Sequence, residues 1–61
     1  MTPTEMIRLL KKNGFLYVKS NNGSHQKYHN PKTGRTVSVP LHAKELKKGL
    51  EQHLLKDAGL K

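Results

Sequence analysis

The sequence predicts an α+β fold in which a helix, three short strands and a second helix follow one another along 61 residues. Apolar residues recur every three or four positions near both ends of the chain, which indicates the two helices. Between them, short runs of β-forming residues alternate with turn-forming sequences. Three successive strands with tight turns favour a three-stranded antiparallel sheet, and both helices can then pack on one face of it.

The first helix is expected over residues 3–13. Thr2 and Glu5 stand three positions apart, as in a capping box, and Pro3 suits the first helical position. Gly14 fits the left-handed conformation that ends many helices. A stripe at i, i+3 and i+4 is expected to face the core, formed by Met6, Leu9 and Leu10.

The first two strands are expected over residues 15–18 and 24–29, joined by the turn-forming sequence of residues 20–23. In the second strand Tyr28 is expected to face the core, with Gln26 as a further candidate. Because side chains alternate along a strand, the opposite face then receives His25, Lys27 and His29.

The third strand is expected over residues 35–39, after a hairpin loop at residues 30–34. Val37 and Val39 alternate with polar residues and are expected to point inward, and Pro40 ends the strand.

The second helix is expected within residues 43–58, where apolar side chains repeat every four positions: Leu46, Leu50, Leu54 and Ala58. Gly49 costs about 1 kcal/mol in a helix interior, so an alternative is a regular helix that begins only there. Gly59 suits the C-terminal cap, and Leu60 can fold back as its hydrophobic contact.

Composition narrows the function classes. A chain of 61 residues buries one core, which indicates a single domain spanning residues 1–61 and excludes large cofactor enzymes. Twelve Lys and Arg against four Asp and Glu give a net charge of +8, so a polyanionic partner is expected. No apolar run suits a membrane span or a signal peptide, and the absence of cysteine fits a reducing cytoplasm.

The four histidines do not predict a metal site. His25 and His29 share a face of the expected strand, yet four residues of strand separate them by about 13 Å. One ion cannot bridge that distance, because its bonds to nitrogen are about 2 Å long. The four carboxylates are scattered over helical stretches and form no close acidic pair, so neither a metal nor another cofactor is expected.

RNA cleavage without a metal requires no set of metal ligands, because the ribose 2′-hydroxyl can attack the neighbouring phosphate once a base removes its proton. His25 is the best candidate for that base, since it starts a strand after a turn glycine and shares a face with Lys27. The alternative is an ordinary solvated histidine. His42 follows a chain reversal and can approach the same face or bond to backbone in a loop, and His29 can contact RNA or be merely exposed. His53 lies among leucines, which favours a half-buried structural role.

Lys44, Lys47 and Lys48 are spaced i, i+3 and i+4, which predicts that they share one face of a helical turn near the start of the second helix. Positive charge at a helix N-terminus opposes the helix dipole, and such a local conflict often marks a functional position. Lysines and free N–H groups at a helix start suit a phosphate backbone. The alternative is a charged face that is simply solvated.

Several short motifs in order resemble a known family. These are Gly23-Ser24-His25, Tyr28, Asn30-Pro31, Val37-Ser38-Val39-Pro40 with His42, the run from Lys44 to Gly49, and the run from Leu55 to Leu60. Together they are similar to the HicA (YcfA-like) mRNA interferase toxins, and the resemblance spans nearly the whole chain.

The resemblance implies a fold like that of double-stranded-RNA-binding domains and a metal-independent endoribonuclease, a toxin that cleaves mRNA and arrests translation. It implies that His25 is catalytic, and that Lys44, Lys47 and Lys48 contact phosphates. It also implies a HicB-type antitoxin that masks the active site, so we expect a monomeric toxin within a hetero-oligomeric complex. Two other classes stay open: a non-catalytic double-stranded-RNA-binding module, and a small ribosomal or DNA-binding structural protein.

Overall fold

The computed structural model describes residues 1–21 and 24–61 of the chain. The elements follow in the order α1 (Pro3–Lys12), β1 (Leu16–Asn21), β2 (His25–His29), β3 (Thr36–Pro40) and α2 (Lys48–Asp57). Gly23, the glycine that precedes His25 and part of the expected first turn, lies outside the described residues. The α-β-β-β-α order confirms the predicted α+β fold, and it is consistent with the architecture of double-stranded-RNA-binding domains.

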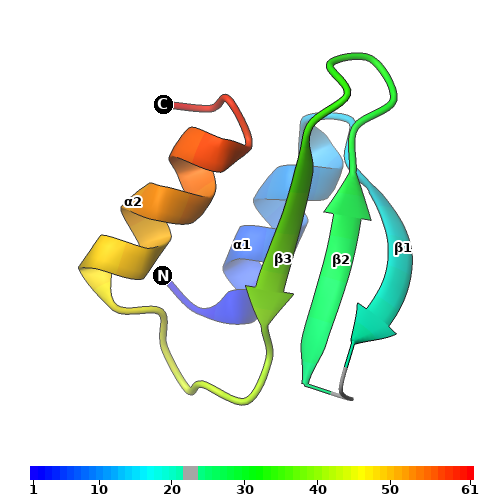
Figure 1. Cartoon of the computed structure of the whole chain (residues 1–61). Helices are drawn as coiled ribbons and strands as arrows, with labels where there is room; N and C mark the ends of the chain where they lie inside the picture. Colours follow the sequence, from blue (N-terminus) through cyan, green and yellow to red (C-terminus); the bar gives the residue numbers. More distant parts are fainter. Residues whose placement is uncertain (22–23) are drawn as a thin grey trace.

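The three strands form one antiparallel sheet in the order β1-β2-β3. In the pairing of β2 with β3, His25 stands opposite Pro40 and Lys27 stands opposite Ser38. The pairing of β1 with β2 shifts register between Tyr17 and Lys19. Both helices lie on the same side of this sheet, as Figure 1 shows, which leaves the other face uncovered by helix.

The first helix is fixed by the local signals that predicted it. The Thr2 hydroxyl accepts a hydrogen bond from the Glu5 N–H at 3.1 Å, and the Glu5 carboxylate accepts one from the Thr2 N–H at 2.7 Å. These bonds to Thr2 lower the pKa of Glu5 from its ordinary value. At the other end Gly14 adopts φ +93°, and the Phe15 N–H reaches the Leu10 carbonyl at 3.0 Å. Phe15, expected in the strand, instead closes the helix and enters the core.

The core lies between the helices and the sheet and consists of Met6, Leu10, Phe15, Tyr28, Val37, Val39, Leu46, Leu54 and Ala58. Tyr28 faces inward as predicted, and its hydroxyl donates a hydrogen bond to the Gln26 side chain at 2.7 Å. Burial raises the pKa of Tyr28. Leu9, which was expected to face the core, is only half-buried. Leu50 is 37% exposed, unlike Leu46, Leu54 and Ala58 of the same apolar repeat.

The second helix begins at Lys48, not at residue 43, so the expected helical start is wrong and the alternative start near Gly49 is close to the structure. A contact from the far end of the chain explains the difference: the Leu46 N–H donates to the Met1 carbonyl at 2.8 Å. Leu46 is buried in the core, and Lys47 has extended backbone with ψ of 148°. The chain is therefore anchored in an extended form just before α2.

The end of α2 agrees with its prediction. Gly59 adopts φ +74°, and the Leu60 N–H donates to the Leu55 carbonyl at 2.9 Å, which is the longer bond of a Schellman motif. Leu60 packs against the core. Within residues 1–21 and 24–61, neither helix has the length and apolar character needed to cross a bilayer.

Candidate functional site

A pocket of about 400 Å³ lies where β2 begins and β3 ends. Its polar lining comes from His25 of β2, Ser38 of β3 and three residues that follow β3, namely His42, Glu45 and Lys47. Its apolar lining comes from Pro40, Ala43 and Leu50. A hollow of about 300 Å³ against α1 is lined by Met1, Glu5, Arg8, Leu9 and Lys12, and thus by no histidine. The pocket that His25 and His42 line is therefore the candidate site.

His25 is held by the sheet. It is the first residue of β2, stands opposite Pro40 of β3, and is half-buried. The Ser24 hydroxyl lies 3.3 Å from the Nδ1 atom of its ring, and the Ser24 carbonyl accepts a hydrogen bond from the Leu41 N–H. These contacts connect the start of β2 to the segment after β3, so they hold His25 in place at the wall of the pocket.

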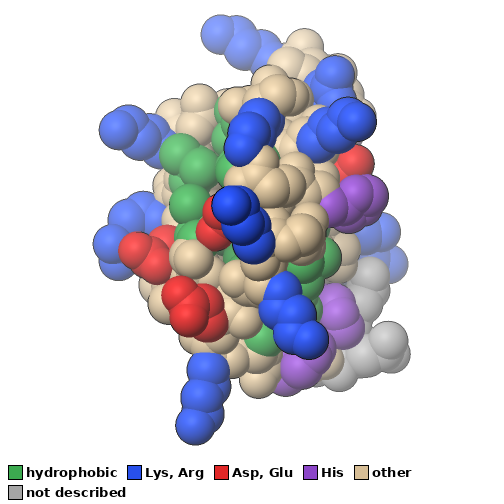
Figure 2. All heavy atoms as spheres, turned by 90° about the vertical axis from the view of Figure 1, so that its left-hand side faces the viewer, with side chains coloured by type: hydrophobic (Ala, Val, Ile, Leu, Met, Phe, Trp, Pro, Cys, Tyr) green, Lys and Arg blue, Asp and Glu red, His purple; other side chains and the backbone are tan. Residues whose placement is uncertain are grey.

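His42 lies beside His25, although 17 positions separate them in the sequence. The two ring centroids are 5.5 Å apart, and the ring planes meet at 60°, an edge-to-face arrangement. His42 is exposed and belongs to the irregular segment between β3 and α2. Of the two possibilities for His42, the structure shows the approach to His25. Figure 2 shows histidine side chains gathered at the lower right of that face, beside a basic side chain.

The three lysines near α2 do not share a helical face, so that prediction is wrong. Lys44 precedes the helix, Lys47 is its N-cap and Lys48 is its first residue. All three are exposed, and of the three it is Lys47 that lines the pocket. No side-chain hydrogen bond from Lys47 caps α2 in the described structure. The first turn of this helix thus combines backbone N–H groups with cationic side chains next to the two imidazoles.

Lys27 and His29 continue along β2 away from the pocket. Both are half-buried and project from the same face of the strand as His25. The His29 Nδ1 atom lies 2.8 Å from the Thr36 hydroxyl at the far end of the sheet. Four strand residues place His29 about 13 Å from His25, so it does not belong to the pocket itself. Among the described residues, no three His, Asp or Glu side chains lie close enough together to hold a metal ion.

His53 differs from its expected half-buried position. Its side chain is 66% exposed, and its Nε2 atom lies 3.2 Å from Asp57 on the same helix. The leucine repeat suggested burial, but the core-facing side of α2 is occupied by Leu54 and Ala58. Basic side chains are spread over the whole face in Figure 2, whereas most of the acidic ones visible there lie toward its left side.

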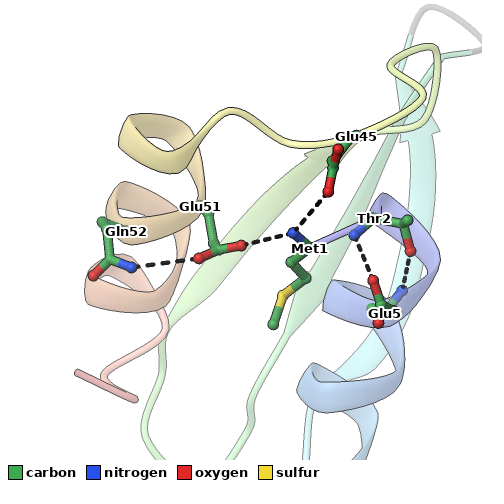
Figure 3. Close-up of polar contacts among 6 residues, drawn as sticks. All are labelled: Met1, Thr2, Glu5, Glu45, Glu51 and Gln52. Carbon is green, nitrogen blue, oxygen red and sulfur yellow. Dashed lines mark hydrogen bonds and ion pairs between the residues drawn. The ribbon is translucent and has the colours of Figure 1, made fainter.

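The Met1 ammonium group contacts two carboxylates next to the pocket. The Met1 ammonium lies 3.0 Å from Glu51 and 3.6 Å from Glu45, and Figure 3 shows it between α2 and the segment that carries Glu45. The hydrogen bond and charge of Glu51 raise the pKa of this amine from its ordinary value of 8.0. Because Glu45 and Lys47 flank the buried Leu46, these contacts fix the side of the pocket opposite β2.

Sequence reasoning missed five pocket residues: Ser38, Pro40, Ala43, Glu45 and Leu50. Ser38 carried a usable signal, since it points away from the core between two inward valines. Leu50 carried a misleading one, because it continues an apolar repeat whose neighbouring members are buried.

A family model described as HicA toxin of bacterial toxin–antitoxin systems matches residues 3–60 of the chain. A comparison with curated proteins found no match. The family match covers both helices, the whole sheet and every residue of the pocket. The chain therefore belongs to the HicA toxin family of bacterial toxin–antitoxin systems.

Proposed function

We propose that this toxin is a metal-independent endoribonuclease that cleaves mRNA in the cytoplasm and so arrests translation, with His25 as its catalytic residue. One observation carries the proposal: His25 lines a pocket of about 400 Å³ whose other wall holds Lys47 at the start of α2. A base and a phosphate-binding site therefore face the same space.

Cleavage needs two things from the protein. A base must take the proton of the 2′-hydroxyl, and imidazole suits that task because its ordinary pKa lies near neutrality. Fixed positive charge must stabilise the phosphorus centre as it gains an oxygen. Lys47 and the first N–H groups of α2 supply that charge. The RNA contributes the nucleophile, which is why so small a pocket suffices.

Other basic residues extend the RNA contact beyond the reacting phosphate. Lys44 and Lys48 are close in sequence to Lys47, which lines the pocket together with His42. On β2, Lys27 and His29 continue from His25 along the uncovered face of the sheet. These residues provide a path for the sugar–phosphate backbone, and such contacts carry no base specificity.

A toxin–antitoxin pair requires a partner protein, and the charge of the toxin indicates its chemistry. With a net charge of +8, the toxin favours a HicB-type antitoxin that presents acidic side chains over the same pocket. We propose that one toxin chain acts as a monomer and that the antitoxin holds it in a hetero-oligomeric complex. RNA and antitoxin then compete for one surface.

The test is a cleavage assay in excess chelator with His25→Ala and a matched histidine control. His53→Ala removes an exposed imidazole outside the pocket, so it controls for the loss of a histidine as such. We expect His25→Ala to slow cleavage by about 10²- to 10⁴-fold while RNA binding persists, and His53→Ala to cleave normally. Undiminished cleavage by His25→Ala contradicts the assignment. RNA binding without any cleavage by the unsubstituted protein supports the non-catalytic double-stranded-RNA-binding module instead.

A further inference from the structure

Resting on the proposed function, we infer that His42 is the general acid of the reaction: it protonates the 5′-oxygen that leaves when His25 activates the 2′-hydroxyl. The pocket that both rings line then holds the phosphodiester that is cut.

The geometry that carries this inference is the pairing of the two imidazoles. Their centroids are 5.5 Å apart, and both rings line the same pocket. In-line displacement at phosphorus has the attacking and leaving oxygens on opposite sides, so it needs two proton-transfer groups at different positions around one phosphate. Two imidazoles at the wall of one pocket supply two such groups.

The surroundings of each ring divide the roles. His25 is half-buried, fixed by strand pairing, and has the Ser24 hydroxyl 3.3 Å from Nδ1. If Nδ1–H donates to that hydroxyl, the Nε2 lone pair remains free to act as a base. His42 is exposed on an irregular segment, and no side-chain hydrogen bond to its ring occurs among the described residues. An exposed ring can recover its proton from water after each turnover.

The remaining charged groups around His42 have other roles. Glu45 and Lys47 line the same pocket from the segment that carries His42, and Lys27 follows His25 along β2. The Glu45 carboxylate is paired with the Met1 ammonium at 3.6 Å. Lysine side chains supply positive charge, so Lys27 and Lys47 suit stabilisation of the charge that develops at phosphorus.

The step balances as follows. His25 takes the proton of the 2′-hydroxyl, and the 2′-oxygen forms a bond to phosphorus. The bond between phosphorus and the 5′-oxygen breaks, its electron pair stays on that oxygen, and His42 imidazolium donates the proton that neutralises it. The products are a 2′,3′-cyclic phosphate and a 5′-hydroxyl. Proton exchange with water then restores the two histidines.

A substrate with sulfur in place of the bridging 5′-oxygen tests the role of His42, because a thiolate leaves without being protonated. The cleavage site of the unsubstituted toxin is mapped first on ordinary RNA, and the sulfur is placed there. We expect His42→Ala to lose about 10²- to 10⁴-fold on the oxygen substrate and to cut the sulfur substrate nearly as fast as the unsubstituted toxin. His25→Ala should be slow on both substrates, and His53→Ala should be normal on both.

Three outcomes overturn the inference. The first is unchanged cleavage of the oxygen substrate by His42→Ala. The second is an equal loss of His42→Ala on both substrates, which a binding or folding defect would produce. The third is rescue of His25→Ala by sulfur. Each of these differs from failure of the proposed function, in which the unsubstituted toxin cuts neither substrate. His42→Gln repeats the test with a polar side chain that keeps the segment hydrated but donates no proton.

Discussion

The two helices begin in opposite ways. At α1, Thr2 and Glu5 form a complete capping box, and the acidic residue in the first turn agrees with the helix dipole. At α2, Glu51 also places an acidic residue in the first turn, but the N-cap is Lys47, the next residue is Lys48, and Gly49 follows them. Positive charge and glycine both disfavour a helix start. Local interactions therefore stabilise the start of α1, whereas the residues at the start of α2 disfavour a helix there.

The difference teaches what holds the second helix in place. The buried side chain of Leu46 and its N–H bond to Met1 fix the chain before α2, and the pairing of Met1 with Glu51 fixes the first turn. Tertiary contacts thus replace a side-chain cap. Since no cap occupies them, the first N–H groups of α2 stay available beside the pocket, together with the charge of Lys47. At the start of α1, by contrast, the Glu5 N–H is already bonded to the Thr2 hydroxyl.

The largest expected effect comes from removing the anchor before α2. Leu46→Ala deletes a buried side chain, and we expect it to lower the free energy of unfolding by about 2–5 kcal/mol, as measured by urea denaturation. Leu50→Ala is the matched control, because Leu50 is 37% exposed and its truncation leaves no closed cavity. Equal losses from both variants would show that α2 does not depend on this anchor.

The same contrast explains how much the sequence predicts. The signals for α1 lie within a few residues of its ends, so its cap, its core stripe and its closing glycine could be predicted locally. The start of α2 depends on contacts between Met1 and residues 45–51, which no local pattern encodes. His25 and His42 could each be singled out by type and position. Their proximity depends on the register of β2 with β3 and on the path of the chain after Pro40, which the sequence does not specify.

Giving α2 a cap should separate stability from function. In Lys47→Ser, a hydroxyl can accept a bond from the first turn, and we expect the free energy of unfolding to rise by about 1 kcal/mol. RNA affinity should fall, and its log–log dependence on salt should become shallower by about 0.7 per lost phosphate contact. Lys32→Ser removes the same charge from the exposed loop between β2 and β3 and serves as the control. An unchanged salt dependence of RNA binding in Lys47→Ser would show that Lys47 does not contact phosphate.

Removing the cap of α1 should affect stability alone. Thr2→Ala deletes the hydroxyl that accepts the Glu5 N–H, and we expect a loss of about 1 kcal/mol in the free energy of unfolding. Cleavage at a temperature well below the unfolding midpoint should remain normal, because α1 contributes nothing to the lining of the pocket that holds His25. A selective loss of activity in Thr2→Ala would contradict the division of roles between the two helix starts.

The smallest expected effect is a pH dependence of the anchor itself. The pKa of the Met1 amine is raised in the folded protein above its ordinary value of 8.0, chiefly by Glu51. A raised pKa means that the folded state favours the charged amine, so this contribution to stability is complete below pH 8 and is lost as the pH rises through the folded-state value. The pair is near the surface, so salt should weaken the effect. Urea unfolding of the toxin and of Glu51→Gln across this pH range measures it. The stability difference between them should shrink above pH 8, and a difference that stays constant would mean that Glu51 acts on α2 without the amine.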